Sequence, residues 1–334
     1  METDEDYDSY RNLDPSQILD AVESTGLICD GRIFALNSYE NRVYQVGIED
    51  SKPVIAKFYR PGRWSDEAIL EEHAFTIELL ESDIPVVAPQ CDEKGNTLHR
   101  HRNFRFVVYP RQGGRPPEPD QPEQLVQLGR FIGMMHNVGA TRLFTSRPNL
   151  DLDSSGRDAS KYILENGFMP QDLETAYSTL CEDLDRRIRN CIERTGDYST
   201  IRLHGDCHPS NILWFNNGPV ILDFDDARSG PAIQDLWMFL SGERQYATAR
   251  LADLLEGYTT FRDFDARELH LIEALRSLRI MNYAAWIARR WDDPAFPLAF
   301  PQFNTRRYWE EQILSLREQA ALMDEPPLEW TMDR

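Results

Sequence analysis

Lysine is nearly absent from this chain of 334 residues. Only Lys52, Lys57, Lys94 and Lys161 occur, so arginine supplies most of the 36 cationic side chains, against 56 aspartates and glutamates. The net charge of −20 disfavours nucleic-acid binding, because a protein that binds a duplex needs clustered cations to displace counterions from phosphates. The same acidity suits a cationic substrate or a basic protein segment, although a solvated acidic surface accounts for any single charge equally well.

Long apolar runs and paired cysteines are missing as well. No run approaches the roughly 18 apolar residues that span a bilayer, and the acidic first residues are the reverse of a basic signal sequence. The five cysteines are odd in number and scattered without a Cys-x-x-Cys pair, which indicates reduced thiols. We therefore expect a cytoplasmic protein without a membrane partner. Its 41% hydrophobic and 11% aromatic residues can fill one large or two modest domains.

Two carboxylates and an amide have the spacing that a phosphotransferase requires. Asp206 precedes Asn211 by five positions, as the catalytic-loop aspartate of protein kinases precedes its metal-binding asparagine, and Asp223 follows. Transfer of the γ-phosphoryl group of ATP needs a carboxylate near the acceptor hydroxyl and hard oxygen ligands for Mg²⁺. We expect Asp206 and Asp223 to be catalytic, with Asn211 and Asp223 holding Mg²⁺.

The segment between Asn211 and Asp223 is predicted to be a β-hairpin. Residues 212–214 and 220–222 are apolar and flank a turn rich in asparagine and glycine. This hairpin would bring the two metal ligands together. Alternation along an extended chain would place Asp225 on the same side as Asp223, as a supporting carboxylate, while a solvated turn is the alternative.

One lysine lies inside an apolar strand. Residues 54–59, with Lys57, resemble the Val-Ala-Ile-Lys signature whose lysine holds the α- and β-phosphates. An edge-strand lysine that guards against aggregation is the alternative. The pattern then predicts a helix over residues 66–81 with Glu72 on its apolar face. We expect Glu72 to pair with Lys57, and Glu71 is the competing choice.

The predicted hairpin that precedes this strand contains a loop without glycine. Residues 37–41 occupy the place where a typical protein kinase has its glycine-rich loop. A side-chain hydroxyl must then help the backbone N–H groups to cover the phosphates, and Ser38 is our candidate for contacting ATP. An ordinary polar turn is the alternative.

A short apolar strand over residues 105–110 ends in proline and leads into a connector rich in glycine and proline. Backbone groups of Val108, Tyr109 and Pro110 are expected to hydrogen-bond the adenine edge in a mostly apolar pocket. A plain core strand is the alternative, and side-chain identity does not separate the two.

The motif around Asp206 resembles that of a known superfamily. The stretches His204-Gly205-Asp206-x-His208-x-x-Asn211, Asp223-Phe224-Asp225 and Asp235-Leu236-Trp237 are similar to the aminoglycoside phosphotransferase and choline kinase-like group. Further stretches resemble bacterial stress response kinases, which are regarded as cytosolic serine/threonine protein kinases. These stretches are residues 36–45, 57–61, 234–238 and 289–297.

The resemblance implies supporting roles around the catalytic loop. His204 would orient the loop, His208 would support Asp206 or a phosphate, and Asp235 would brace the loop backbone. The apolar residues 236–240 offer an alternative for Asp235, as a carboxylate at a helix N-terminus. A zinc site at His204, Asp206 and His208 is the rival interpretation, disfavoured because alternate side chains of an extended loop point apart.

We therefore predict an α+β, bilobal protein kinase-like fold. Residues 1–110 would form an ATP-binding lobe with an antiparallel sheet plus a helix, residues 111–117 a hinge, and residues 118–334 a larger, mainly helical catalytic and substrate lobe. The predicted activity is ATP- and Mg-dependent phosphorylation of protein serine or threonine, including autophosphorylation, in a bacterial stress response.

Two alternatives remain open from the sequence. The wider superfamily mostly phosphorylates small alcohols such as aminoglycosides, choline or homoserine, and no Ala-Pro-Glu follows Asp223 to mark a typical protein kinase. A nonenzymatic ATP-binding scaffold is less favoured, because Lys57, Asp206, Asn211 and Asp223 are all retained. The sequence decides neither the physiological substrate nor the oligomeric state.

Overall fold

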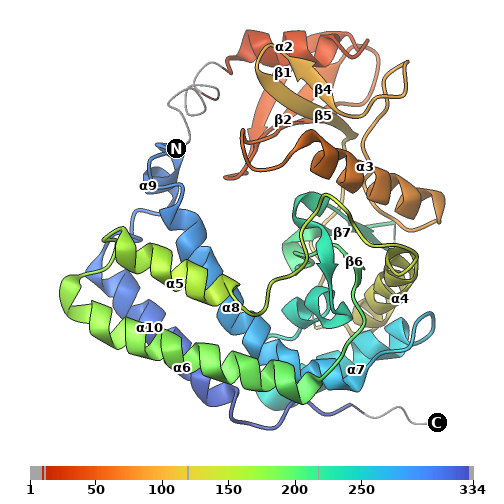
Figure 1. Cartoon of the computed structure of the whole chain (residues 1–334). Coiled ribbons are helices and arrows are strands. Elements are labelled where there is room, and N and C mark those ends of the chain that lie inside the picture. The colour runs from red at the N-terminus through yellow and green to blue at the C-terminus, as the bar shows by residue number, and fades with distance from the viewer. Residues whose placement is uncertain (1–9, 11–12, 119, 217, 331–334) are drawn as a thin grey trace.

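The computed structural model describes residues 10, 13–118, 120–216 and 218–330. An antiparallel sheet with two helices forms the N-terminal part, and a larger, mainly helical part follows (Figure 1). The α-helices are α2 Pro15–Glu23, α3 Asp66–Glu81, α4 Pro122–Gly139, α5 Ser155–Glu165, α6 Gln171–Thr195, α7 Arg244–Tyr258, α8 Ile272–Ala288, α9 Ala295–Ala299 and α10 Arg306–Leu322. The strands are β1 Cys29–Leu36, β2 Arg42–Ile48, β3 Val54–Phe58, β4 His99–His101, β5 Phe104–Pro110, β6 Ile201–Leu203, β7 Ile212–Phe215, β8 Gly218–Ile221 and β9 Arg228–Gly230.

The N-terminal sheet places Lys57 in its middle strand. Its order is β1-β2-β3-β5-β4, and every neighbouring pair is antiparallel. Alternate residues of β3, Val54, Ala56 and Phe58, are buried in a core shared with α2. Lys57 therefore projects from the opposite face of a central strand, which excludes the edge-strand alternative.

Helix α3 has the bounds that the sequence predicts and connects the two parts. Ser65 caps it by accepting a hydrogen bond from the backbone N–H of Ala68, and Asp66 in the first turn suits the helix dipole. Phe75 and Leu79 of its buried face belong to the large core of the C-terminal part. The chain after α3 continues this link, because the N–H of Val87 donates to a carbonyl at the end of β8, 3.1 Å away.

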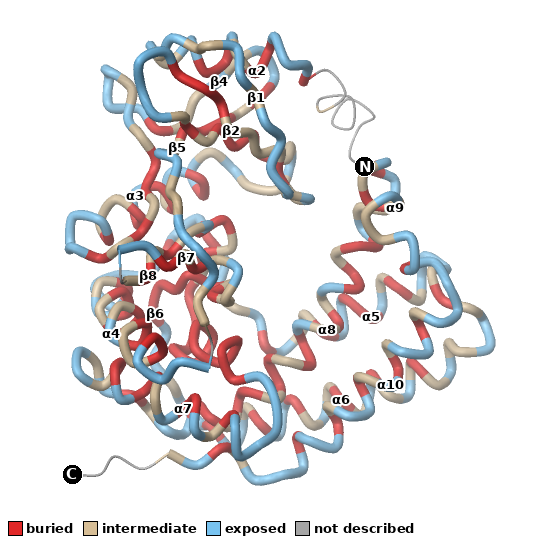
Figure 2. Tube along the Cα trace, turned by 180° about the vertical axis from the view of Figure 1, so that it is seen from behind, coloured by how far each residue is buried: buried red, intermediate tan, exposed pale blue. Residues whose placement is uncertain are grey.

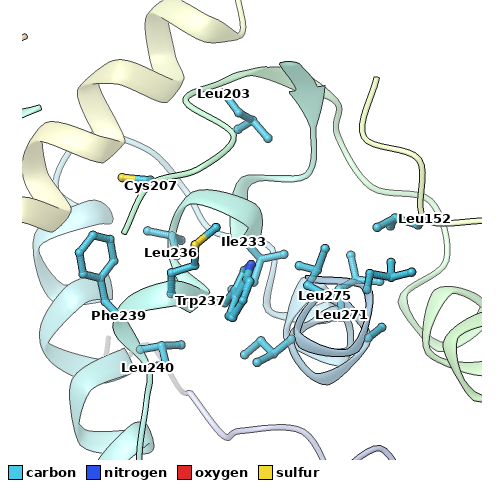
Figure 3. Packing of buried hydrophobic residues seen from close by; sticks show 14 of the residues in the cluster. Leu152, Leu203, Cys207, Ile233, Leu236, Trp237, Phe239, Leu240, Leu271 and Leu275 are labelled. Atoms are coloured by element: carbon cyan, nitrogen blue, oxygen red, sulfur yellow. The ribbon is translucent and has the colours of Figure 1, made fainter. Parts of the chain in front are cut away.

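The core of the C-terminal part lies directly beneath the Asp206 loop. Figure 3 shows Leu203 and Cys207 from this segment among apolar side chains of the 233–240 segment and of the chain entering α8. Residues 231–240 are all buried, and Figure 2 shows exposed residues along the outer faces of the helices around this core. The Asp206 loop therefore rests on a rigid base.

Residues 236–240 do not form the expected helix. Two short 3₁₀ turns, Ala232–Asp235 and Trp237–Phe239, take its place. The idea that Asp235 is a carboxylate at a helix N-terminus is therefore wrong. Within the described ranges, every helix is too short or too polar to cross a membrane.

Candidate active site

A cavity of about 320 Å³ lies between the N-terminal sheet and the β7–β8 hairpin. Its volume falls at the lower end of the range for small-molecule sites, about 300 to 1,000 Å³. Its walls combine apolar side chains with a few convergent polar groups. The lining residues are Leu36, Ser38, Asn41, Val43, Ile55, Lys57, Glu72, Thr76, Val87, Tyr109, Pro110, Gln112, Leu213, Leu222, Asp223 and Phe224.

The structure brings five of the six residues expected to bind ATP to this cavity. Val108 is the exception: it is buried in the sheet, and its carbonyl accepts a hydrogen bond from the N–H of Gln90 at 2.8 Å. Tyr109 and Pro110, which follow it, do line the cavity. Any adenine contact from this strand end therefore falls to residues 109–110 in the present geometry.

A buried carboxylate anchors the loop that carries Asp206. The two oxygens of Asp235 accept hydrogen bonds from the backbone N–H groups of His204 and Gly205, each at 2.8 Å. His136 lies 3.1 Å from Asp235 and 2.9 Å from the hydroxyl of Tyr258, and its side chain is fully buried. This network fixes the start of the loop, because each buried polar group in it has a partner.

His204 and Gly205 connect the Asp206 loop to the Asp223 segment. The Nδ1 atom of His204 accepts the N–H of Asp206 at 3.3 Å, so Nε2 carries the proton and donates to the carbonyl of Leu222 at 2.6 Å. Gly205 has a φ of +85°, and a Cβ there would lie 2.2 Å from the carbonyl oxygen of Asp226. Only glycine permits this close approach.

Asp206 itself is held through both of its carboxylate oxygens. His208 lies 3.3 Å from Oδ2, and the guanidinium of Arg279 donates to Oδ1 at 2.5 Å. Burial favours a raised pKa, but the hydrogen bond from His208 and the charge of Arg279 outweigh it and hold the pKa of the Asp206 carboxyl well below its ordinary value. Asp206 is therefore ionised at every pH at which the protein would be assayed.

Asn211 and Asp223 come together at the base of the hairpin. The side-chain amide of Asn211 donates to the backbone carbonyl of Asp206 at 3.0 Å, and the backbone carbonyl of Asn211 accepts the N–H of Leu222 at 2.9 Å. Asp223 has the left-handed backbone conformation, with a φ of 57°, and its side chain is 57% exposed. A nonglycine residue pays about 1 kcal/mol for this conformation, which is characteristic of functional positions.

These two residues fit a magnesium ion. With its NH₂ group committed to Asp206, Asn211 has its side-chain oxygen left for a ligand, and Asp223 offers an exposed carboxylate. Hard oxygens of this kind suit Mg²⁺ better than zinc. The zinc interpretation fails for His204, because both of its ring nitrogens are already engaged with backbone groups.

Lys57 lies between two carboxylates. Its Nζ atom is 3.1 Å from an oxygen of Asp223 and 3.1 Å from an oxygen of Asp225. Burial alone would lower the pKa of Lys57, but these two charges more than offset it and raise the pKa well above its ordinary value. Lys57 therefore carries its positive charge at the edge of the cavity.

Asp225 is buried and contacts several nitrogen donors. Besides Lys57, it receives the guanidinium of Arg63 and, at 3.1 Å, the side-chain amide of Asn41. Burial would raise its pKa, but Lys57 and the nearby arginines hold the pKa of Asp225 well below its ordinary value. The alternation expected for residues 223–225 is wrong, since Phe224–Asp226 is a 3₁₀ turn. Asp225 nevertheless shares Lys57 with Asp223.

The expected pairing of Lys57 with Glu72 is corrected by the structure. Among the described residues no ion pair joins these two side chains; Glu72 instead accepts a hydrogen bond from Arg147 at 2.9 Å. The reason is that Asp223 and Asp225 already take the ammonium group. Glu71, the competing choice, accepts the backbone N–H groups of residues 145–147 and is not a partner of Lys57.

Sequence reasoning missed several residues that build the site. Arg147 is buried and also donates to the carbonyls of Asp225 and Ala227, at 2.8 and 3.0 Å. Asn41 is buried, and its side-chain oxygen accepts the N–H of Arg60 at 3.1 Å. No local pattern marks either residue, because their partners are far away in the sequence.

The same loop contacts the far end of the C-terminal part. Glu40 accepts hydrogen bonds from the indole N–H of Trp286 at 2.6 Å and from Arg290 at 2.9 Å. Asp293 accepts a hydrogen bond from Arg60 at 2.9 Å. The loop that borders the cavity is thus attached to both parts of the molecule.

Comparisons with known proteins agree with this geometry. The family described as "Phosphotransferase enzyme family" matches residues 33–272. The chain is 42% identical to stress response kinase A of Escherichia coli O157:H7 over 323 residues, which cover 97% of both chains. It is 41% identical to serine/threonine protein kinase RdoA of Salmonella typhimurium, again over 97% of both.

Solved structures share the fold at low sequence identity. An amicoumacin kinase, hAmiN, in complex with AMP-PNP, Ca²⁺ and Ami has a TM-score of 0.70 at 18% identity, over 91% of this chain and 96% of that one. Choline kinase from Cryptosporidium parvum has a TM-score of 0.61 at 12% identity, over 93% and 96%. Together with the five-stranded sheet, they confirm the predicted α+β kinase-like fold with a mainly helical C-terminal part.

Proposed function

Because the chain belongs to the phosphotransferase enzyme family, we propose that it transfers the γ-phosphoryl group of ATP to serine or threonine hydroxyls of proteins, its own included, in the cytoplasm. Curated relatives at 41–42% identity carry the names stress response kinase A and serine/threonine protein kinase RdoA. The observation that carries the proposal is the contact between Lys57 and Asp223, which joins the N-terminal sheet to the catalytic hairpin around one cavity.

Different residues of the cavity contact different parts of ATP. The apolar walls and the strand end at Tyr109 and Pro110 hold the base, and Ser38 covers the phosphates. Lys57 compensates phosphate charge from the sheet side. Asn211 and Asp223 would hold Mg²⁺, which supplies charge neutralisation between the β- and γ-phosphates when bound.

Asp206 positions the acceptor. A strongly ionised carboxylate is a weak base, yet a loose phosphoryl-transfer transition state demands little base strength until late in the reaction. Asp206 therefore orients the hydroxyl by accepting its hydrogen bond and takes the proton as the new bond to phosphorus forms. His204, Gly205 and Asp235 keep the carboxylate at the place where this occurs.

We also propose that the chain has two lobes, which meet at residues 111–117. Boundaries at residues 110 and 118 follow the end of β5 and the start of the chain that leads to α4. Helix α3 is an exception to these boundaries. It precedes residue 110, but its Phe75 and Leu79 pack in the core of the larger part. Motions of the two lobes would therefore carry α3 with the Asp206 side rather than with the sheet alone.

The test follows the fate of radiolabelled ATP with Mg²⁺. Purified protein is incubated alone, with a generic basic protein, and with kanamycin, choline and homoserine, beside Asp206→Ala and the control Asp20→Ala, an exposed carboxylate on α2. We expect label on serine or threonine of protein in the wild type and in Asp20→Ala, and none in Asp206→Ala. Label on a small alcohol only would reassign the chain to the metabolite kinases, and ATP binding without any transfer would leave a scaffold.

A further inference from the structure

Arg279 contacts the carboxylate of Asp206, to which the acceptor hydroxyl would donate its hydrogen bond. It projects from the middle of α8, a helix that runs from beneath the catalytic loop towards α9 (Figure 1). Its Nη1 atom lies 2.5 Å from Oδ1 of Asp206, while His208 occupies Oδ2. Each oxygen of the carboxylate thus has one partner, and an acceptor hydroxyl that approaches Oδ1 competes with Arg279 for it.

Arg279 is the partner that can move. Its side chain is 45% exposed, and Asp206 is its only ion-pair partner among the described residues. An arginine buried for structural reasons looks different in this molecule: Arg147 is fully buried and contacts Glu72 together with backbone carbonyls. The guanidinium of Arg279 is therefore accessible to another carboxylate, so it can exchange partners.

An aromatic surface continues from Arg279 along the same side of α8. We call Tyr39, Tyr283, Trp286 and Phe300 the aromatic shelf. Tyr283 follows Arg279 by one helical turn, is 49% exposed, and stacks on Trp286 with a ring separation of 5.6 Å. Phe300 lies 6.2 Å from Tyr283 and 5.1 Å from Tyr39, whose loop borders the cavity. The shelf therefore places partly exposed aromatic rings one helical turn from the arginine that contacts Asp206.

We infer that Arg279 is a specificity-determining residue that binds a carboxylate next to the acceptor hydroxyl and releases Asp206 as it does so. This inference rests on the proposed kinase function and names its substrate class, which is serine or threonine in an acidic segment of protein. The exchange replaces one carboxylate partner of Arg279 with another, so the guanidinium stays paired. The Asp206 carboxylate keeps His208 and gains the hydrogen bond from the acceptor hydroxyl. The exchange also places the freed oxygen of Asp206 beside the hydroxyl.

The local charge opposes the expectation drawn from the whole chain. A net charge of −20 favours cationic substrates at long range. A cationic acceptor at Asp206 would nevertheless meet the guanidinium of Arg279 within contact distance, where like charges repel. Contact electrostatics decides specificity, while long-range charge decides only the rate of encounter.

The test uses serine peptides that differ at one position near the serine, which carries Asp, Asn or Lys, with the position varied along the peptide. For the wild type we expect kcat/KM on the best Asp peptide to exceed that on its Asn counterpart by about tenfold or more, with Lys lowest. Arg279→Gln should bring the Asp to Asn ratio close to one, and Arg279→Lys should keep part of it. The Kd for Mg·ATP, measured by calorimetry, should be unchanged in both variants.

The control is Arg289→Gln, which removes a cation from the end of the same helix that lies over Tyr162 rather than Asp206. This variant should keep the wild-type ratio. A wild type without preference, or an Arg279→Gln protein that keeps it, would overturn the inference and leave the kinase proposal intact. Absence of transfer to any serine or threonine acceptor by the wild type would instead overturn the proposed function itself.

Discussion

The nucleotide side and the acceptor side of the same cleft are built in opposite ways. Around the nucleotide cavity, Lys57, Glu72 and Asp225 are buried. Asp225 pairs with Lys57, and buried or half-buried arginines contact both Glu72 and Asp225. On the acceptor side, Asp206 faces the exposed Arg279 and the partly exposed His208. The first side is fixed before any ligand arrives, whereas the second can exchange partners.

The difference follows from what each side must recognise. ATP is the same molecule in every turnover, so a rigid set of charged side chains can bind its phosphates without reorganisation. Acceptor segments vary, and a solvent-exposed pair exchanges at little cost. Substitutions on the two sides should therefore differ in kind. Those on the nucleotide side should affect folding and ATP binding, and those on the acceptor side should affect transfer and selectivity without affecting ATP binding.

The largest effect is expected at Asp223, which serves the nucleotide side twice. Asp223→Ala removes a metal ligand and a partner of Lys57, so we expect phosphoryl transfer to fall by about a thousandfold or more. Mg-dependent ATP binding should weaken with it, which calorimetry with and without Mg²⁺ would detect. Asp263→Asn alters an exposed carboxylate outside the cavity lining and is the control. Transfer by Asp223→Ala within tenfold of the wild type would contradict this role.

A comparison of two arginines sharpens the contrast in stability. Arg147→Met leaves Glu72 buried without its partner, and we expect the free energy of unfolding to fall by about 3 kcal/mol. Arg279→Gln removes an exposed cation and should change it by less than about 1 kcal/mol. Urea unfolding measures both.

The double variant Arg147→Met with Glu72→Gln distinguishes two causes of a lower free energy of unfolding, an unpaired buried charge and lost packing. It should recover much of the loss, since position 72 no longer carries an unpaired buried carboxylate. Equal losses for Arg147→Met and Arg279→Gln would remove the distinction between a fixed side and an exchangeable side.

An intermediate effect is expected at Glu268, beneath the segment that carries Asp235. Its carboxylate accepts the N–H of Ile233 at 2.9 Å, and burial raises the pKa of Glu268 from its ordinary 4.5 to about 7. Between these values the unfolded chain loses the proton while the folded chain keeps it, so this residue makes stability decline as pH rises from about 4.5 to 7.

Glu268→Gln removes that decline and keeps an oxygen acceptor. The variant should gain on the order of 2 kcal/mol over the wild type at pH 8 and much less at pH 5. Urea unfolding at the two pH values gives the difference. A gain of the same size at both values would show that the carboxyl does not titrate as described.

The smallest effect is expected where the loop of residues 37–41 is attached to the C-terminal part. Glu40→Gln weakens the contacts with Trp286 and Arg290 by about 1 kcal/mol, so the KM for ATP should rise about fivefold, with a smaller change in kcat. Glu49→Gln, an exposed carboxylate after β2, is the control. A lower kcat at unchanged KM would place Glu40 on the acceptor side of the comparison.

Local pattern predicted what depends on neighbours in the sequence. Helix α3 has the predicted bounds, and the hairpin of β7 and β8 and the strand carrying Lys57 are present where expected, because periodicity and turn residues encode them. The same rules do not predict the structure of residues 236–240. Their apolar run fits a helix, but the structure has 3₁₀ turns there, with Asp235 engaged by backbone N–H groups of the distant catalytic loop.

The sequence also does not predict which distant residues pair with each other. Arg147 pairs with a residue 75 positions away, and Arg279 with one 73 positions away. Neither arginine stands out among the other arginines of the chain. The chemistry of the nucleotide side could be inferred from motif spacing, whereas the acceptor side depends on which surface helix the fold brings to Asp206.

The most direct test of this account measures Mg·ATP binding and phosphoryl transfer side by side in the wild type and in Asp206→Ala. Because Asp206 belongs to the acceptor side, we predict that Asp206→Ala binds Mg·ATP with a Kd within about threefold of the wild type and loses transfer to serine or threonine by about a thousandfold or more. Transfer at the wild-type rate by Asp206→Ala would contradict the account.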